Sequence, residues 1–277
     1  MEWIDDFLKR NFSETLKHNS CIQDKLLETY VYRSLKHESV GVTDKYIVGK
    51  IIQNKTLDDG TSSEFRNTLG FIEAYDHLHK LSGDRDGGLL ENNLICEVHK
   101  ILMKYHKNDD TAGKYSVKDR IAEFDGSIHY YSSHHHLESE MQALIDKYNS
   151  KWDAINRHIR GKDDVKSLEE LIRLLTWLVY TFLEIHPFSD ANGRMIRLLY
   201  TYIMEAYGFP FQLPLLWFNE NEPSSLYNRE GEDDYRKWCK LLWNARVTKD
   251  LAVLEDEMIR SLKLYCQDYE NFIKGYI

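Results

Sequence analysis

Two long apolar segments joined by a short polar connection constrain the fold of this chain more than any other feature. The first, residues 168–185, follows a capping-box pattern at 167–170 (SLEE) that predicts a helix start, and it ends at Pro187. The second, residues 193–206, is apolar almost all round, which is typical of a helix buried in a core. The sequence therefore predicts two core helices joined through residues 186–192.

The connection and the start of the second helix suit a bound anion. Residues 186–197 read HPFSDANGRMIR. The first turn of a helix presents N–H groups without intrahelical partners and a partial positive charge, so the backbone at Asn192 and Gly193 can bind phosphate. Arg194 and Arg197 lie three residues apart, so both can reach the same site, and their guanidinium groups match phosphate oxygens.

Two further side chains of this segment add chemistry. His186 is a candidate general base, because an unperturbed imidazole titrates near neutral pH. Asp190 can hold Mg²⁺ through one carboxylate together with phosphate oxygens. Each residue alone also fits a helix cap, a turn or a surface ion pair. Their combination between two apolar helices favours a binding site, because burying such charges without a ligand or mutual pairing is costly.

The segment resembles the signature of the Fic family, HPFx[D/E]GNGRxxR, with Ala191 where glycine is usual. Asn67, Val98-His99 and Ala112–Tyr115 match upstream landmarks of the family in order, and residues 60–215 look like the family core. The resemblance implies a mainly α fold, a Fic-fold helical bundle with a small β-hairpin flap.

The resemblance also implies an activity, that of a protein adenylyltransferase (an AMPylator) that transfers AMP from ATP to a hydroxyl side chain of a target protein or of itself. In such a reaction His186 would deprotonate the hydroxyl group and Asp190 would hold Mg²⁺. Phe188 would fix the loop in the core. The phosphate contacts would come from Asn192, Gly193, Arg194 and Arg197.

A second match concerns control of this site. Residues 34–39 (SLKHES) resemble the inhibitory motif [S/T]xxxE[G/N] that some Fic proteins carry on an N-terminal helix. Ser34 and Glu38 lie four residues apart, on one face of an expected helix at about 22–38. The resemblance implies that Glu38 competes with the γ-phosphate of ATP for Arg197, and that the same glutamate takes part in removing AMP. The helix would dock on the core through Ile22, Leu26, Tyr30, Val31 and Leu35.

A short hairpin interrupts the helical pattern. Asp125-Gly126 is a strong two-residue turn signal, and residues 120–124 and 127–131 flank it as candidate strands. Fic proteins carry a target-docking flap at this place in the chain, where an exposed strand edge can pair with an extended segment of a target. Ile121 and Ala122 are therefore candidate docking residues, and a surface hairpin without a docking role is the alternative.

Composition narrows the class of partner. The chain of 277 residues has 36 basic and 45 acidic residues, a formal charge of −9, which argues against nucleic acid or an anionic membrane as the main partner.

The first six residues carry acids where a signal peptide needs a basic start. The four cysteines are widely spaced, which fits reduced thiols. We expect a cytoplasmic protein.

The expected organisation has three parts: an N-terminal helical region at 1–59 that carries the inhibitory helix, the Fic core at 60–215, and a C-terminal helical extension at 216–277 packed on the core. A homodimer is compatible with the family. Ala191 leaves open a different phosphate-linked donor, such as CDP-choline. A helical interaction module without catalytic activity is the remaining alternative, and nothing in the sequence names the target protein.

Overall fold

The computed structural model describes residues 20–36, 40–42, 44–54, 62–84, 87–106, 110–159, 164–209, 212, 215 and 234–274. Within these residues the chain is mainly α-helical with one two-stranded sheet, which confirms the expected fold class. The strands are β1 (Ile121–Phe124) and β2 (Ser127–Tyr130). The described helices are α3 (Ser20–Lys36), α4 (Lys45–Asn54), α5 (Ser63–Ser82), α6 (Asn92–Leu102), α7 (Leu137–Ile159), α8 (Asp164–Ile185), α9 (Asn192–Tyr207), α10 (Asp234–Thr248) and α11 (Ala252–Lys274).

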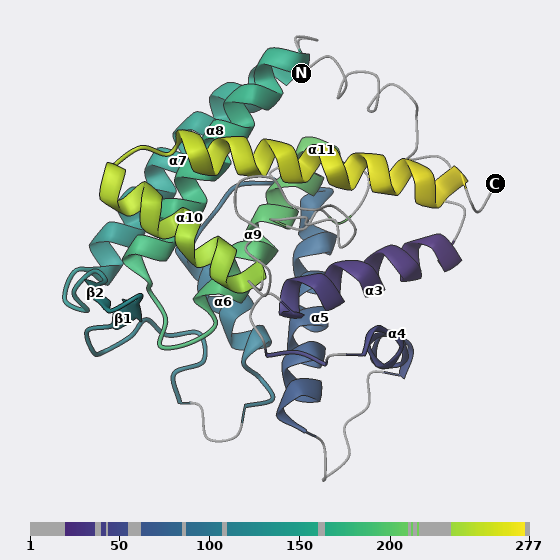
Figure 1. Ribbon diagram of the computed structural model, residues 1–277, viewed down its shortest axis with the longest axis horizontal. Helices are drawn as coiled ribbons and strands as arrows, with labels where there is room; N and C mark the ends of the chain where they lie inside the picture. Colours follow the sequence, from purple (N-terminus) through teal and green to yellow (C-terminus); the bar gives the residue numbers. More distant parts are fainter. Residues whose placement is uncertain are drawn as a thin grey trace.

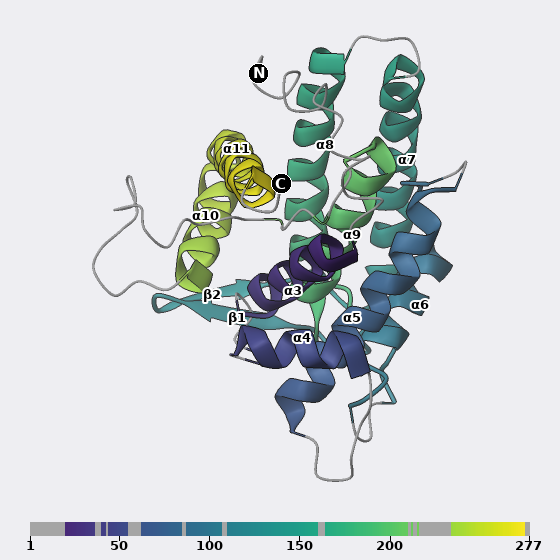
Figure 2. The same cartoon turned by 90° about the vertical axis from the view of Figure 1, so that its right-hand side faces the viewer.

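Helix α9 runs through the middle of the molecule, with α3, α5 and α8 in contact around it (Figures 1 and 2). Every residue from Arg194 to Met204 is buried, as the continuous apolar pattern predicts. Gly208 ends the helix with a φ of 114°, a left-handed conformation that glycine adopts readily. The N-terminus of α9 therefore opens inside the molecule.

Helix α8 supplies the other half of the central pair. The capping-box prediction was wrong in position, because α8 begins at Asp164 and residues 167–170 lie inside the helix. Once a first turn exists each further residue adds one hydrogen bond, so a local capping pattern does not prevent the helix from extending. The end of α8 at Ile185, just before Pro187, agrees with the prediction.

The predicted hairpin is present, with Ile121 paired to Tyr130 in an antiparallel register. Asp125 and Gly126 have φ angles of 47° and 76°, as the two-residue turn requires. Cross-strand partners share a face, so the same face carries Ile121, Ile128 and Tyr130, which are 63%, 56% and 73% exposed.

Helix α3 packs against α4, α5 and α9. The docking face expected from the sequence is confirmed, because all five of its members are buried: Ile22, Leu26, Tyr30, Val31 and Leu35. The described part of α3 ends at Lys36, so Glu38 lies outside the described residues.

The two C-terminal helices lie on the outside of the bundle. Helix α11 packs along α8, where Arg173 Nε donates to Glu255 Oε1 at 3.2 Å. Helix α10 contacts α11 and lies beside the hairpin (Figures 1 and 2). Among the described residues, no helix combines the length and the apolar character needed to cross a membrane.

Candidate active site

The loop between α8 and α9 is bounded by two residues in the left-handed region. His186 has a φ of 52° and Ala191 a φ of 63°. Such a conformation is unfavourable for residues with a side chain and is maintained only where surrounding contacts enforce it, often at functional sites. The φ of Ala191 gives a physical reason for glycine at this position of the signature, because glycine adopts it at little cost.

The side chain of Asn192 holds this loop together. Its Nδ2 donates to the carbonyl of Phe188 at 2.8 Å, and its Oδ1 accepts from the N–H of Phe188 at 3.0 Å. Asn192 is 2% exposed, so this amide is used within the loop. Any contact of Asn192 with an anion therefore falls to its backbone N–H, next to that of Gly193, in the first turn of α9.

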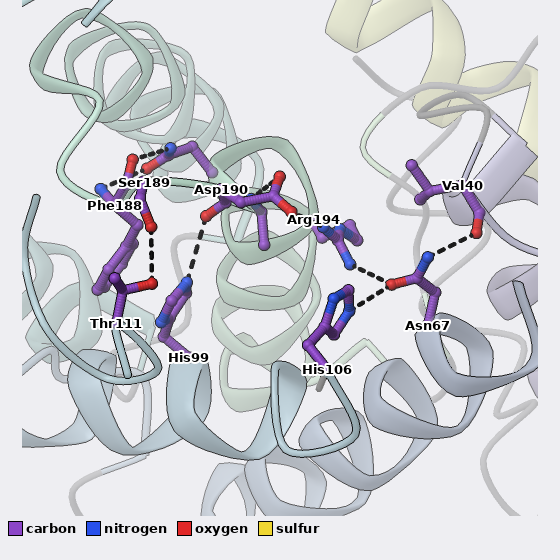
Figure 3. Close-up of polar contacts among 11 residues, drawn as sticks. Val40, Asn67, His99, His106, Thr111, Phe188, Ser189, Asp190 and Arg194 are labelled. Atoms are coloured by element: carbon purple, nitrogen blue, oxygen red, sulfur yellow. Dashed lines mark hydrogen bonds and ion pairs between the residues drawn. The ribbon is translucent and has the colours of Figure 1, made fainter. Parts of the chain in front are cut away.

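Phe188 and His99 form the floor of the loop. Both side chains are fully buried, and their rings stack with centroids 3.8 Å apart. His99 Nδ1 accepts from the N–H of Gly113 at 2.8 Å, so the ring proton is on Nε2, which donates to the carbonyl of Asp190 at 3.2 Å (Figure 3). His99 thus connects the segment around Gly113 to the loop. The sequence identified His99 only as a residue that matches the family, and it did not predict this role.

Arg194 is buried and makes two defined contacts. Its Nη1 donates to Asn67 Oδ1 at 2.9 Å and its Nη2 to Asp190 Oδ2 at 3.1 Å. Asn67 Oδ1 also bonds His106 Nε2 at 2.6 Å, and Asn67 Nδ2 donates to the carbonyl of Val40 at 2.9 Å (Figure 3). The chain just after α3 is therefore connected through Asn67 to a residue of the expected phosphate site.

Arg197 lies one turn further along α9 and is 1% exposed. The hydroxyl group of Tyr30 on α3 approaches its backbone carbonyl at 3.5 Å. Ser34, one turn after Tyr30, is 1% exposed. The structure thus brings α3 against α9 at Arg197 with Ser34 buried, while Glu38 lies outside the described residues.

His186 is largely buried, and its ring stacks on Tyr131 with centroids 3.9 Å apart. The pKa of His186 is lowered to about 4, mainly by burial. The carbonyl of Leu183 raises this pKa, and the nearby positive charges lower it further. The Nδ1 atom is buried and lacks a hydrogen bond of normal geometry to the described residues. The imidazole is therefore neutral at pH 7, the state in which a histidine can accept a proton.

The carboxylate of Asp190 fits a magnesium ion held together with a nucleotide. Burial alone would raise the pKa of Asp190, but the Arg194 charge and the N–H of Ala191, which donates at 2.6 Å, outweigh it and lower the pKa. The side chain is 61% exposed, so its carboxylate is accessible. In the described part of the chain no group of three acidic, histidine or cysteine side chains could hold a metal alone. One carboxylate plus phosphate oxygens is a common donor set for Mg²⁺.

The two candidate docking residues lie at the start of β1. Ile121 is exposed and Ala122 is half-buried, on opposite faces of the strand. Tyr131, which follows β2 and stacks on His186, places the hairpin next to the loop between α8 and α9. The structure therefore brings the hairpin and His186 together.

Known proteins resemble this chain in sequence and in fold. Residues 89–204 match the Fic/DOC family. A Fido domain-containing protein of Dictyostelium discoideum is 33% identical over 102 residues, 35% of this chain and 63% of that protein. The protein adenylyltransferase Fic of Nematostella vectensis is 22% identical over 264 residues, 95% of this chain and 52% of that protein. A crystal structure of a Fic-domain-containing signalling protein from Bacteroides thetaiotaomicron superimposes with a TM-score of 0.68 at 18% identity, covering 96% of this chain and 97% of that one.

The fold and the histidine–arginine loop are those of Fic-domain proteins, and residues 89–204 of this chain form a Fic/DOC domain. The chain spans less than two thirds of the length of the curated relatives it matches.

Proposed function

We propose that this chain is a protein adenylyltransferase, which transfers AMP from ATP to a hydroxyl group of a protein. The observation that carries the proposal is the loop 186–197, on which a neutral histidine, an accessible carboxylate, a helix N-terminus and two buried arginines occur together. A base and phosphate-binding groups on one loop suit the transfer of a phosphate-linked group.

The reaction would proceed by attack of the target hydroxyl oxygen on the α-phosphorus of ATP. The bond from that phosphorus to the oxygen bridging to the β-phosphate breaks, and pyrophosphate leaves. His186 accepts the hydroxyl proton at Nε2, because Nδ1 is buried. The N–H groups of Asn192 and Gly193 and the guanidinium groups of Arg194 and Arg197 bind the phosphates.

Asp190 would hold Mg²⁺, which neutralises charge on the triphosphate when it is bound. No other described acidic side chain is needed for this, because the phosphate oxygens and water supply the remaining ligands.

Autoinhibition by Glu38 is the second part of the proposal. The chain on either side of residues 37–39 is held close to the site: Tyr30 contacts the backbone of Arg197, and Val40 is bonded to Asn67, which binds Arg194. A carboxylate between these two anchors can pair with Arg197 in place of the γ-phosphate. The same carboxylate could position water for removal of AMP, as the family resemblance implies.

The partner would be a hydroxyl-bearing protein, docked on the hairpin or, in self-modification, a second copy of this chain. The target would contact the start of β1, where Ile121 is exposed and Ala122 is half-buried on the opposite face. The interior of the cytoplasm, where ATP is plentiful, would be its place of action.

A labelling experiment tests the activity and the inhibition separately. Wild-type protein, Glu38→Gly and Glu38→Gly/His186→Ala are incubated with Mg²⁺ and ATP labelled at the α-phosphate, and label on protein is counted. We expect strong labelling by Glu38→Gly alone, and a loss of about a hundred- to ten-thousand-fold in the double variant. ATP labelled at the γ-phosphate is the control, since label from it would indicate phosphorylation instead.

A different donor is the second candidate, and it is favoured by Ala191, whose methyl group stands at the N-cap of α9 where the family usually has no side chain. Thermal unfolding with ATP or CDP-choline distinguishes the two, because the ligand that binds the folded protein more tightly raises the midpoint more. Labelling by Glu38→Gly that fails with ATP and succeeds with CDP-choline would replace the first candidate.

A further inference from the structure

Helix α10 lies outside residues 89–204, which match the Fic/DOC family, yet it is bonded to the end of helix α8. Arg246 Nε donates to Glu184 Oε1 at 2.9 Å, and Arg246 Nη2 donates to the same oxygen. Glu184 lies two residues before His186. The side chains of Arg246 and Glu184 are only 16% and 23% exposed, so this ion pair is much less solvated than a typical surface pair.

The contacts continue from Glu184 to the catalytic imidazole through the hairpin. Glu184 Oε1 is 3.7 Å from Nε2 of His129 on β2. The ring of His129 meets the ring of Tyr131 edge-on, with centroids 4.8 Å apart and an angle of 89°. Tyr131 in turn stacks on His186 at 3.9 Å and 18°. The three rings and the ion pair form one continuous cluster, which we call the α10 relay: Arg246, Glu184, His129, Tyr131 and His186.

Helix α10 also holds the rest of the hairpin. Arg236 Nη2 donates to Asp125 Oδ1 in the turn at 3.0 Å. Near the end of β1, the ring of Phe124 lies 6.0 Å from that of Trp243. The hairpin is thus braced by α10 at its turn and along its inner face, where His129 lies. Both ribbon views show α10 beside the two strands (Figures 1 and 2).

The backbone completes the connection. The N–H of Tyr131 donates to the carbonyl of Arg120 at 3.1 Å, and the N–H of Ser132 approaches the carbonyl of Glu184 at 3.4 Å. The residue whose ring stacks on His186 is therefore held through its own backbone N–H and through that of the next residue, Ser132. The stack on Tyr131, with ring centroids 3.9 Å apart and an angle of 18°, restrains the plane of the His186 ring.

We propose that Tyr131 and Arg246 are positioning residues for His186, which makes α10 a working part of the active site. Tyr131 fixes the plane of the imidazole. Arg246 holds Glu184 and, through it, the end of β2 and the end of α8. The inference rests on the proposed role of His186 as a base, but the contacts themselves can be tested without any activity.

The charges of the α10 relay also affect the protonation of His186. Charged and titratable groups around the imidazole come from the residue before β1, from β2, from the residue after β2, from α8 and from α10: Arg120, His129, Tyr131, Glu184 and Arg246. The positive charge of Arg246 disfavours a second positive charge on His186. Loss of Arg246 therefore raises the pKa of His186 and leaves less of the free base at acidic pH.

The decisive variant is Arg246→Met, and Arg173→Met is its matched control. Arg173 also joins α8 to a C-terminal helix through a glutamate, Glu255, but its side chain is 63% exposed and its partner lies on α11. In the Glu38→Gly background we expect kcat to fall by about ten- to a hundred-fold in Arg246→Met, because small displacements of a reacting group have effects of that size. The KM for ATP should change little, and Arg173→Met should resemble its parent.

Arg246→Lys and the pair Tyr131→Phe and Tyr131→Leu separate positioning from simple loss of folding. Lysine keeps the charge and one bond, so it should restore part of kcat. Phenylalanine keeps the stacked ring and should retain kcat, whereas leucine should lose it. Thermal unfolding of each variant is followed by circular dichroism, and kcat is compared only among the variants that are folded.

A titration of the imidazole signals by NMR provides the test that needs no activity. The signal of His186 is assigned by its loss in His186→Asn, and its pKa is compared in wild type, Arg246→Met and Arg173→Met. A higher pKa in Arg246→Met alone supports the relay even if no transfer of AMP is ever found. If the pKa and kcat of Arg246→Met both match those of Arg173→Met, α10 is only a structural support and the inference is wrong.

Discussion

Replacing His186 should remove a defined part of the pH dependence of folding. The pKa of His186 in the folded protein is about 4, whereas an unfolded histidine titrates near 6.5. The folded state therefore binds a proton less readily than the unfolded chain. The stability contributed by the neutral ring is complete above pH 6.5, and it is lost as the pH falls through that value toward 4.

The size of the effect follows from the two pKa values. Between pH 7 and pH 5 the unfolded histidine becomes almost fully protonated while the folded one stays neutral, which lowers the free energy of unfolding by about 2 kcal/mol. In a chain of this length that corresponds to roughly 4–8 °C in the midpoint of thermal unfolding. His186→Asn should lack this contribution, and asparagine is the suitable replacement because it tolerates a φ of 52°.

The assay is urea unfolding of wild type and His186→Asn at pH 7 and at pH 5. The other titrating groups are common to both proteins. The pH-dependent loss of unfolding free energy in wild type, minus that in the variant, is therefore the contribution of His186. We expect wild type to lose about 2 kcal/mol more than the variant over this range. Equal losses in the two proteins would refute a buried neutral imidazole and, with it, the argument that His186 is ready to accept a proton.

Three further predictions concern the same site. Asn67→Ala removes the Nη1 acceptor of the buried Arg194, so the free energy of unfolding should fall by ~1.5–3 kcal/mol in urea titrations; an unchanged midpoint would contradict this. His99→Phe keeps the ring stack but leaves an N–H and a carbonyl without partners, and a loss of at least ~1–3 kcal/mol should appear in the same assay. Initial rates of AMP transfer by Glu38→Gly should stay nearly constant from pH 8 to pH 6, because His186 remains neutral there. A fall in rate below about pH 6.5 would contradict this, because it would indicate an imidazole with the pKa of a solvent-exposed histidine.

Local patterns were sufficient for the elements that carry the site. The apolar run of α9, the stop at Pro187 and the Asp125-Gly126 turn each act over a few residues, and each was read correctly from the sequence. The docking face of α3 was also predictable, because residues spaced by three and four share one side of a helix.

Contacts between distant residues could not be predicted in this way. Asn67 and Arg194 are 127 positions apart, and Arg246 and Glu184 are 62 apart, so no periodicity connects them. The amide of Asn192 shows a related limit: a motif gives the residue type, while the direction of its side chain depends on the loop conformation. That conformation in turn depends on the left-handed backbone of His186 and Ala191, and neither is a glycine, the residue type from which such a conformation can be predicted.

Arg194 already has two partners, and the two contacts differ in strength. The bond between Arg194 and Asp190 involves a carboxylate that is 61% exposed, so exchanging it for phosphate and Mg²⁺ costs little, about 0–1 kcal/mol. The bond between Arg194 and Asn67 is buried, and leaving either group without a partner would cost more. Under the proposed function, nucleotide should therefore displace Asp190 from Arg194 and leave Asn67 in place. Since Asn67 also holds the carbonyl of Val40, this part of the chain should stay attached to the phosphate site whether or not nucleotide is bound.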